Sequence, residues 1–193
     1  MKILKCILLI ITILGGLFLL YYYYGESYLV NYNNKQEVTS LISSKKQHNN
    51  GIIIIPSINK KEMIYYNDIE NNLKNKKIVI LSDLISNNNE FDKYNSPKSP
   101  NFIIGAHNYN RGNLGLTNLN KVKINDIITI IYNNITYKYK VVSNNKTNTR
   151  LDKSILKIDE YNDYLTILSC LNNQEITESA YVDYQMLKAI KLK

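Results

Sequence analysis

The chain is poor in several residue types that mark particular classes of protein. Its 193 residues include no tryptophan, seven glycines, three prolines and only two cysteines, Cys6 and Cys170. The cysteines form no CxxC motif and no Cys/His cluster, so the sequence predicts no metal site. Cys6 stands at the start of an apolar run and Cys170 far downstream, on different sides of a membrane boundary. We therefore expect no disulfide between them.

Arginine is also scarce, which bears on nucleic-acid binding. The formal net charge is +8, but only Arg111 and Arg150 among the 24 basic residues are arginines. The lysines are spread among asparagines and glutamates, whereas nucleic-acid-binding proteins gather Lys and Arg on one helix or face. The composition therefore argues against a nucleic-acid partner. It is compatible with a loose attraction to anionic lipid or cell-wall polymer, which salt would screen.

An uncharged apolar run, residues 7–20, lies near the amino terminus. With its apolar flanks it reaches about 20 residues, the length that crosses a hydrocarbon core of ~30 Å. We therefore predict a transmembrane anchor over residues 1–24. A cleaved signal peptide is the alternative interpretation. It is disfavoured because the run is followed by four tyrosines and by no small-x-small cleavage site.

The charges beside this run predict its orientation. Lys2 and Lys5 precede it, and Glu26 is the first charged residue after it. Because basic flanks stay in the cytoplasm, we expect a single-pass protein with a cytoplasmic amino terminus and an extracellular remainder. Residues 25–50 are polar and are expected to form a partly helical extracellular stalk. The folded domain is expected to occupy residues 51–193.

Short apolar runs separated by Asn-rich turns make up the rest of the chain. We expect strands at residues 51–56, 62–66, 77–81, 101–106, 127–132, 136–142, 164–169 and 180–187, the last of which could also begin a helix. Asn133 and Asn134 suit the tight turn of a hairpin. Short helical turns are expected at residues 68–73 and 114–119, and a long loop at 86–100. Many short strands at close intervals predict an all-β barrel or sandwich.

Two residues with the chemistry of a catalyst directly follow predicted buried strands. His107 comes after residues 101–106, and Cys170 comes after residues 164–169. A reactive group at a strand end is held by the sheet and opens onto a rim or groove. Taken singly, a cysteine in such a place is more often a small core residue, and a histidine in a loop is more often solvated. Together they point to a nucleophile with its acid–base partner. The only other histidine, His48, lies in the polar stalk.

The residues around this pair resemble the sortase family in order and spacing. The matching features are an early apolar strand at 52–58, the GAHN motif with His107 and Asn108, a helical turn at 116–119, a turn at Asn125 and Asp126, and strands at 137–141 and 166–170. The resemblance covers residues 51–187. It implies a closed eight-stranded β-barrel with short helices, carried on the outer face of a Gram-positive-type membrane.

The resemblance also implies a reaction. In sortases a cysteine attacks the carbonyl of a cell-wall sorting signal, an LPxTG-like motif, and an amine then resolves the thioester. Cys170 would be the nucleophile, and His107 the general acid that protonates the leaving amine. An imidazolium beside the thiolate is expected to raise the thiolate fraction. The implied partners are the sorting signals of surface proteins and an amine acceptor, either a peptidoglycan precursor or a pilin lysine. No cofactor is implied.

One feature of the family is missing from the sequence. Sortases carry an arginine at the start of the strand after the cysteine, where it binds substrate and stabilises the oxyanion. Residues 171–184 contain neither Arg nor Lys, and the expected position falls near Thr177 and Ser179. The candidates for its role are Arg111 or Arg150, reaching in from a loop, or the two hydroxyls together with backbone N–H groups. Loss of one oxyanion donor typically lowers the rate ~10²–10³-fold.

Three functions therefore stay open on the sequence. The first is a transpeptidase that cleaves a sorting signal through a Cys170 thioester and transfers it to an amine. The second is a sortase-shaped surface module that binds sorting signals with weak or no turnover. The third is a cysteine peptidase that hydrolyses the thioester without transfer. Trapping of a covalent adduct, peptide binding without the thiol, and product analysis with an added amine distinguish the three.

Overall fold

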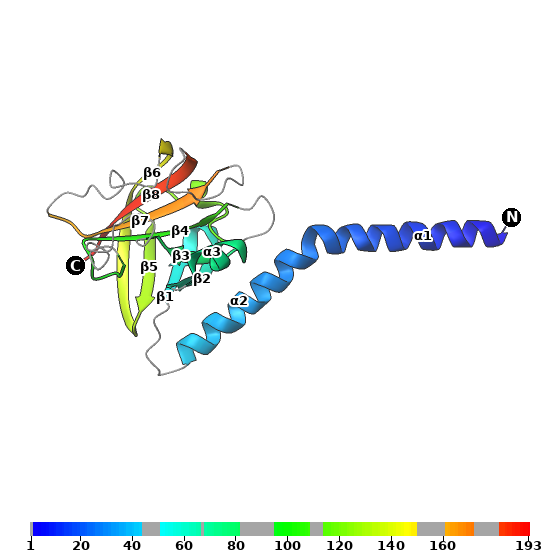
Figure 1. The fold of residues 1–193 in the computed structure, drawn as a ribbon, viewed down its shortest axis with the longest axis horizontal. Helices are drawn as coiled ribbons and strands as arrows, with labels where there is room; N and C mark the ends of the chain where they lie inside the picture. Colours follow the sequence, from blue (N-terminus) through cyan, green and yellow to red (C-terminus); the bar gives the residue numbers. More distant parts are fainter. Residues whose placement is uncertain are drawn as a thin grey trace.

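The protein is a closed β-barrel preceded by a long helix (Figure 1). The computed structural model describes residues 2–43, 51–66, 68–81, 95–108, 114–149, 161–171 and 182–193. Its strands are β1 (Gly51–Ile55), β2 (Lys60–Tyr65), β3 (Ile78–Ile80), β4 (Asn101–His107), β5 (Ile127–Tyr132), β6 (Ile135–Thr149), β7 (Tyr164–Cys170) and β8 (Val182–Lys191). Its helices are α1 (Lys2–Leu20), η1 (Tyr21–Gly25), α2 (Glu26–Ser43), η2 (Pro56–Ile58), α3 (Ile69–Lys74) and η4 (Leu119–Lys121). The predicted fold class is confirmed.

The eight strands close in the order β1-β2-β3-β4-β7-β8-β6-β5. The β2–β3 and β4–β7 pairs are parallel, and the other pairs are antiparallel. Closure gives every strand a hydrogen-bonded neighbour on both sides. The parallel β4–β7 pair matters most for function, because the chain ends of both strands then meet at one end of the barrel.

Alternation along the strands sorts the apolar side chains into two layers. Those inside the barrel, such as Ile104 and Ile167, form the main core. Their neighbours point outward and pack under helix α3 on the face of β3, β4, β7 and β8. We call this second layer the outer cluster: Leu73, Val79, Leu81, Ile103, Leu168, Cys170, Val182 and Tyr184.

The β5–β6 hairpin confirms the predicted turn and corrects the predicted length of its second strand. Asn133 and Asn134 both adopt positive φ, 50° and 63°, as a tight two-residue turn requires. β6 continues to Thr149, although residues 143–149 are polar and show no apolar alternation. They are strand because β8 pairs with them along their whole length, with a register irregularity between Val141 and Ser143.

Most other strand boundaries differ from the prediction by one or two residues, and two elements differ by more. The helical turn expected at 114–119 is instead a β-bridge at Gly115 and a following turn, with the 3₁₀ helix starting only at Leu119. Gly115 has a φ of 50°, which a helix does not permit. The last element is a strand. It is described over Val182–Lys191 and so continues beyond the predicted end at residue 187. Of the loop expected at 86–100, residues 95–100 are described and form bends and turns.

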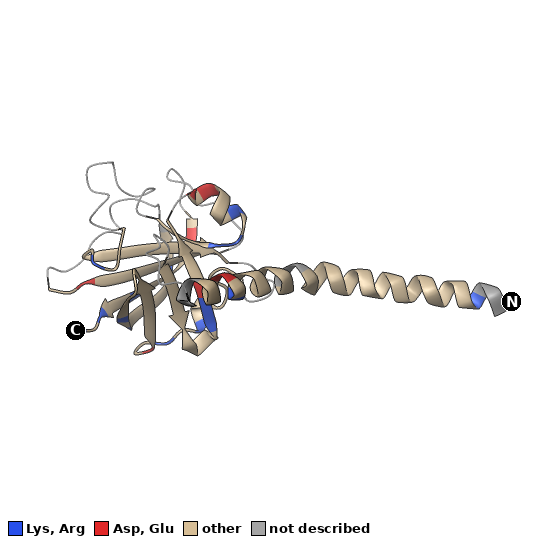
Figure 2. Ribbon diagram, turned by 90° about the horizontal axis from the view of Figure 1, so that it is seen from below, with Lys and Arg blue, Asp and Glu red and all other residues tan. Residues whose placement is uncertain are grey.

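The amino-terminal helix is longer than the anchor that the hydropathy predicted. Its described part over Lys5–Ser40 is long and apolar enough to cross a membrane, by length and composition. The expected anchor boundary after residue 24 falls inside the π-helical turn η1, where Figure 1 shows the helix changing direction. The stalk is helical through Ser43 and therefore more regular than expected. Figure 2 shows that α1 carries charge only near its amino-terminal end.

The far end of α2 rests against the barrel. Val38 is 2% exposed and packs with Ile52 and Met63 on the outer side of β1 and β2. The Tyr65 hydroxyl donates a hydrogen bond to the Glu37 carboxylate. Burial, followed by that hydrogen bond, raises the pKa of Tyr65. The stalk helix is thus attached to the strands at one side of the barrel.

Candidate active site

The fold brings His107 and Cys170 together. They are the last residues of β4 and β7, and they are direct partners in the parallel register of these strands. Adjacent strands lie about 4.8 Å apart, and residues in register emerge on the same face of a sheet. The two side chains therefore stand side by side on the outer face of the barrel. Sequence alone placed each at a strand end, and the parallel pairing makes them neighbours.

The backbone around Cys170 is held from both sides. β7 runs between β4 and β8, and Cys170 is paired with His107 on one side and Tyr184 on the other. The next residue, Leu171, donates its N–H to the carbonyl of Asp183 at 2.7 Å. Such a support fixes the position of a nucleophile without using a loop.

The two side chains differ in exposure. Cys170 has no exposed surface and belongs to the outer cluster, whereas His107 is partly exposed. Burial raises the pKa of the Cys170 thiol to about 12, and a hydrogen bond from its own backbone opposes this shift. Desolvation of the charged sulfur outweighs that hydrogen bond, so the thiol form of Cys170 is favoured in this structure.

Alkylation of Cys170 is expected to be slow and to rise steeply with pH. Only the thiolate reacts, and a pKa of about 12 in place of an ordinary ~8.5 leaves about 10³-fold less thiolate at pH 8. The iodoacetamide rate of a Cys6→Ser chain, followed by intact mass from pH 7 to 11, should keep increasing throughout. A plateau above pH 8.5 would contradict the raised pKa. A Cys6→Ser/Cys170→Ser chain sets the background.

Gly105 lies two residues before His107 on the same face of β4. A Cβ there would stand 2.3 Å from Cδ1 of Leu81 and 3.0 Å from the backbone oxygen of Leu168. Leu81 is fully buried in the outer cluster and crosses β4 at this point. Because Gly105 has no side chain, Leu81 can pack directly on β4 next to His107.

Gly105→Ala is expected to destabilise the fold by about 1–3 kcal/mol, the usual cost of overpacking a core. The cost should fall in a Leu81→Ala background, because the nearest clash is removed and the two positions are coupled. Denaturant unfolding of the full chain in detergent, for the parent, both single variants and the double variant, measures this coupling. Equal costs of Gly105→Ala in both backgrounds would mean that Leu81 is not the obstacle.

Sequence reasoning missed Tyr184, which faces Cys170 from β8. The two are direct partners in the antiparallel register, and Tyr184 is fully buried. Burial and then the charge of Cys170 raise the pKa of Tyr184. Its hydroxyl has no hydrogen-bond partner in the described part of the chain. The alternation of apolar residues in β8 indicates that Tyr184 lies on one of the two faces of this strand. Only the register between β7 and β8 shows that it is a neighbour of Cys170.

The four residues proposed for the arginine's role cannot be placed beside the pair. Arg111, Arg150, Thr177 and Ser179 all lie outside the described residues. The described part of the strand after the cysteine is Val182–Lys191. Within the described ranges no group of three His, Cys, Asp or Glu side chains is arranged to hold a metal ion.

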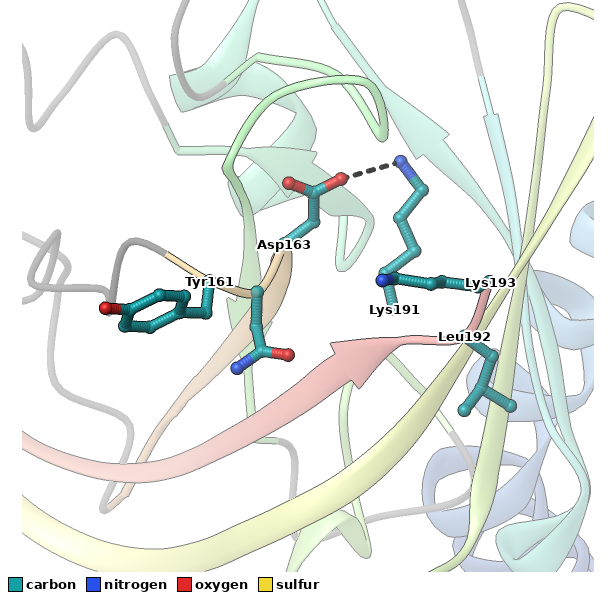
Figure 3. A pocket seen from close by; sticks show the side chains of 6 residues that line it. Tyr161, Asp163, Lys191, Leu192 and Lys193 are labelled. Atoms are coloured by element: carbon teal, nitrogen blue, oxygen red, sulfur yellow. Dashed lines mark hydrogen bonds and ion pairs between the residues drawn. The ribbon is translucent and has the colours of Figure 1, made fainter.

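Two surface depressions lie away from His107 and Cys170. One, of about 220 Å³, is shown in Figure 3 and contains an ion pair of 3.0 Å between Lys191 and Asp163. Asp163 precedes β7 and Cys170 ends it, so this depression is at the opposite end of the strand. The other, of about 380 Å³, is lined by Lys146, Thr147, Asn148, Leu171 and Asp183. Leu171 and Asp183 alternate with Cys170 and Tyr184, which places them on the other face of the sheet.

Comparison with known proteins identifies the family. The model of the sortase domain matches residues 53–184 of this chain, a span that includes β4, β7 and the first part of β8. The chain belongs to the sortase family. Sortases are cysteine transpeptidases, and the matched span contains both His107 and Cys170. No curated protein sequence matches this sortase.

Solved sortase structures share its fold. Sortase C2 of Group B Streptococcus pilus island 1 is 26% identical, with a TM-score of 0.57 over 77% of each chain. Sortase C1 from Streptococcus agalactiae is 23% identical, with a TM-score of 0.57 over 82% of this chain and 76% of that one. The sortase D5 transpeptidase of Clostridium perfringens is 19% identical, with a TM-score of 0.54 over 82% of this chain and 89% of that one.

Proposed function

We propose that this sortase is a membrane-anchored transpeptidase that uses Cys170 as nucleophile and His107 as general acid and base. The observation that carries the proposal is the register pairing of these two residues at the ends of β4 and β7, on one face of the barrel. A nucleophile and an acid–base group that are neighbours on a rigid sheet are the minimum that acyl transfer through a thioester needs.

The reaction has two halves. As the substrate carbonyl enters, the Cys170 thiol passes its proton to the imidazole of His107, and the C–S bond forms. The tetrahedral intermediate collapses, the C–N bond breaks, and His107 returns the proton to the leaving amine. In the second half His107 takes a proton from an incoming amine, which attacks the thioester carbonyl. The C–S bond then breaks, and His107 returns the proton to the departing Cys170 sulfur. The raised pKa of the buried thiol makes the first proton transfer dependent on substrate entry.

The proposed substrate is an LPxTG-like sorting signal of a surface protein. The acceptor is an amine, either of a peptidoglycan precursor or of a pilin lysine. The pilin lysine is supported by the 26% identity to a sortase named for a pilus island. Two parallel incubations, one with a pilin-derived lysine peptide and one with a diamino-acid cross-bridge peptide, separate the two acceptors by the mass of the product.

The proposed location is the outer face of the cell membrane. Residues 1–24 would form the anchor with a cytoplasmic amino terminus, residues 25–50 the stalk, and residues 51–193 the catalytic domain. The uncharged stretch of α1 and the docking of Val38 against Ile52 support this arrangement. A stalk attached to β1 and β2 would hold the catalytic face in a defined orientation relative to the membrane.

The deciding experiment is to trap the acyl-enzyme. Full-length protein in detergent is incubated with an LPxTG-like peptide and no acceptor, and its intact mass is recorded. We expect a mass gain equal to the amino-terminal product, located on Cys170 and released by hydroxylamine. A panel of sorting-signal peptides that gives neither adduct nor cleavage would refute the transpeptidase.

The burial of Cys170 favours one alternative, a sortase-shaped binding module. A thiol with no exposed surface and a raised pKa is a poor nucleophile until something uncovers and ionises it. Such a module would bind a sorting-signal peptide equally well as the parent and as Cys170→Ser, without forming an adduct. Fluorescence anisotropy of a labelled peptide with both chains, beside the trapping experiment, distinguishes the two functions.

A further inference from the structure

Tyr184 occupies the position on β8 that faces the nucleophile. It is the direct antiparallel partner of Cys170, and residues so paired have their side chains next to each other on one face of the sheet. Both side chains belong to the outer cluster, and neither has exposed surface. Cys170 therefore has His107 on one flank and Tyr184 on the other.

The hydroxyl of Tyr184 is buried without a hydrogen-bond partner in the described part of the chain. An unsatisfied buried hydroxyl costs about 1–3 kcal/mol, so its presence calls for a reason. The chain offers a contrast in Tyr139, which is also almost fully buried but donates its hydroxyl to the carbonyl of Pro97 at 3.4 Å. Tyr139 follows the usual rule for buried tyrosines, and Tyr184 does not.

The two side chains are also within electrostatic reach of each other. After burial, the charge of Cys170 is the next cause of the raised pKa of Tyr184. The raised pKa keeps the phenol protonated at every pH at which the enzyme would work. Tyr184 therefore remains a hydrogen-bond donor on the strand next to Cys170, and its hydroxyl has no partner among the described residues.

We propose that Tyr184 donates a hydrogen bond to the carbonyl oxygen of the sorting signal and takes the role that an arginine performs in other sortases. The proposal rests on the transpeptidase function proposed above. When the Cys170 sulfur adds to the carbonyl carbon, the electron pair of the C=O bond moves to the oxygen. The O–H of Tyr184 stabilises that oxyanion and keeps its proton. The electron pair then moves back from the oxygen to re-form the C=O bond as the C–N bond breaks. His107 protonates the leaving amine.

A neutral donor suits this position better than a cation. The neighbours of Tyr184 in the outer cluster are apolar, among them Leu168 and Val182. A buried guanidinium without a partner would carry a large desolvation cost, whereas a phenol places its ring in the apolar layer and needs only one acceptor. The substrate carbonyl supplies that acceptor at the moment when charge develops on it.

Tyr184→Phe tests the proposal, because it removes the hydroxyl and keeps the ring. In steady-state assays of the full chain with an LPxTG-like peptide, we expect kcat to fall about 10²- to 10³-fold with little change in KM. The unfolding free energy should be unchanged or slightly higher, since an unsatisfied group is removed. The pH dependence of Cys170 alkylation should stay that of the parent, which a direct action on the thiol would not allow. Tyr139→Phe is the matched control and should keep the parental kcat.

The outcomes separate this proposal from the one on which it rests. A parent chain that forms no acyl-enzyme refutes the transpeptidase and with it the role of Tyr184. An active parent with an equally active Tyr184→Phe chain overturns the role of Tyr184 alone. So does a fall in kcat matched by an equal fall in the alkylation rate. If Tyr184→Phe is less stable than the parent, 3-fluorotyrosine incorporated at Tyr184 changes the donor strength at nearly constant shape, and an unchanged kcat then overturns the proposal.

Discussion

Cys170→Ala is expected to lower kcat for sorting-signal transfer by about 10⁶-fold, the loss seen when a covalent nucleophile is removed. The physical reason is that no other described side chain next to His107 on this face can form an acyl intermediate. His107→Gln should cost about 10²–10⁴-fold, the range for a general acid or base. Release of the carboxy-terminal peptide, measured by chromatography with and without an amine acceptor, gives both values.

Cys6→Ala provides the control for this pair of variants. Cys6 is the only other cysteine and lies in α1, so its removal should leave kcat unchanged. The Cys170→Ala/His107→Gln double variant should be no slower than Cys170→Ala alone, because residues that act as a unit are not additive. Substantial residual acyl transfer in Cys170→Ala would place the nucleophile elsewhere in the chain.

Lys60→Met is expected to destabilise the fold by about 3–5 kcal/mol, the cost of leaving one charge of a buried pair without its partner. Lys60 and Glu62 are 2% and 4% exposed, and Lys60 Nζ lies 3.0 Å from Glu62 Oε1. They alternate with Ile64 on β2 and thus face the inside of the barrel. Burial lowers the pKa of Lys60 and raises that of Glu62, and their mutual attraction opposes both shifts. Denaturant unfolding in detergent measures the loss.

The double variant Lys60→Met/Glu62→Leu is expected to recover most of this loss. Two apolar residues of similar volume replace the pair without leaving a buried charge. Lys61→Met is the matched control, because Lys61 is the exposed neighbour of Lys60, and it should change stability by less than about 0.5 kcal/mol. A double variant as unstable as Lys60→Met would show that the lysine stabilises β2 through contacts other than Glu62.

The sequence by itself determined the local features of this sortase. Strand positions, the hairpin at Asn133 and Asn134, the uncharged amino-terminal run and the placement of His107 and Cys170 after apolar strands all follow from residue type and spacing within a short window. The prediction of strand length was wrong where pairing with a neighbouring strand outweighs the composition of the segment. Residues 143–149 are polar, yet they form strand because β8 binds them.

Only the tertiary structure decided which residues meet at the active site. Register is a relation between strands distant in sequence, and a shift of one residue moves a side chain to the other face of the sheet. That relation makes His107 a neighbour of Cys170 and places Tyr184 on the other flank. It also buries the Cys170 thiol and raises its pKa, because desolvation depends on everything that packs around the sulfur.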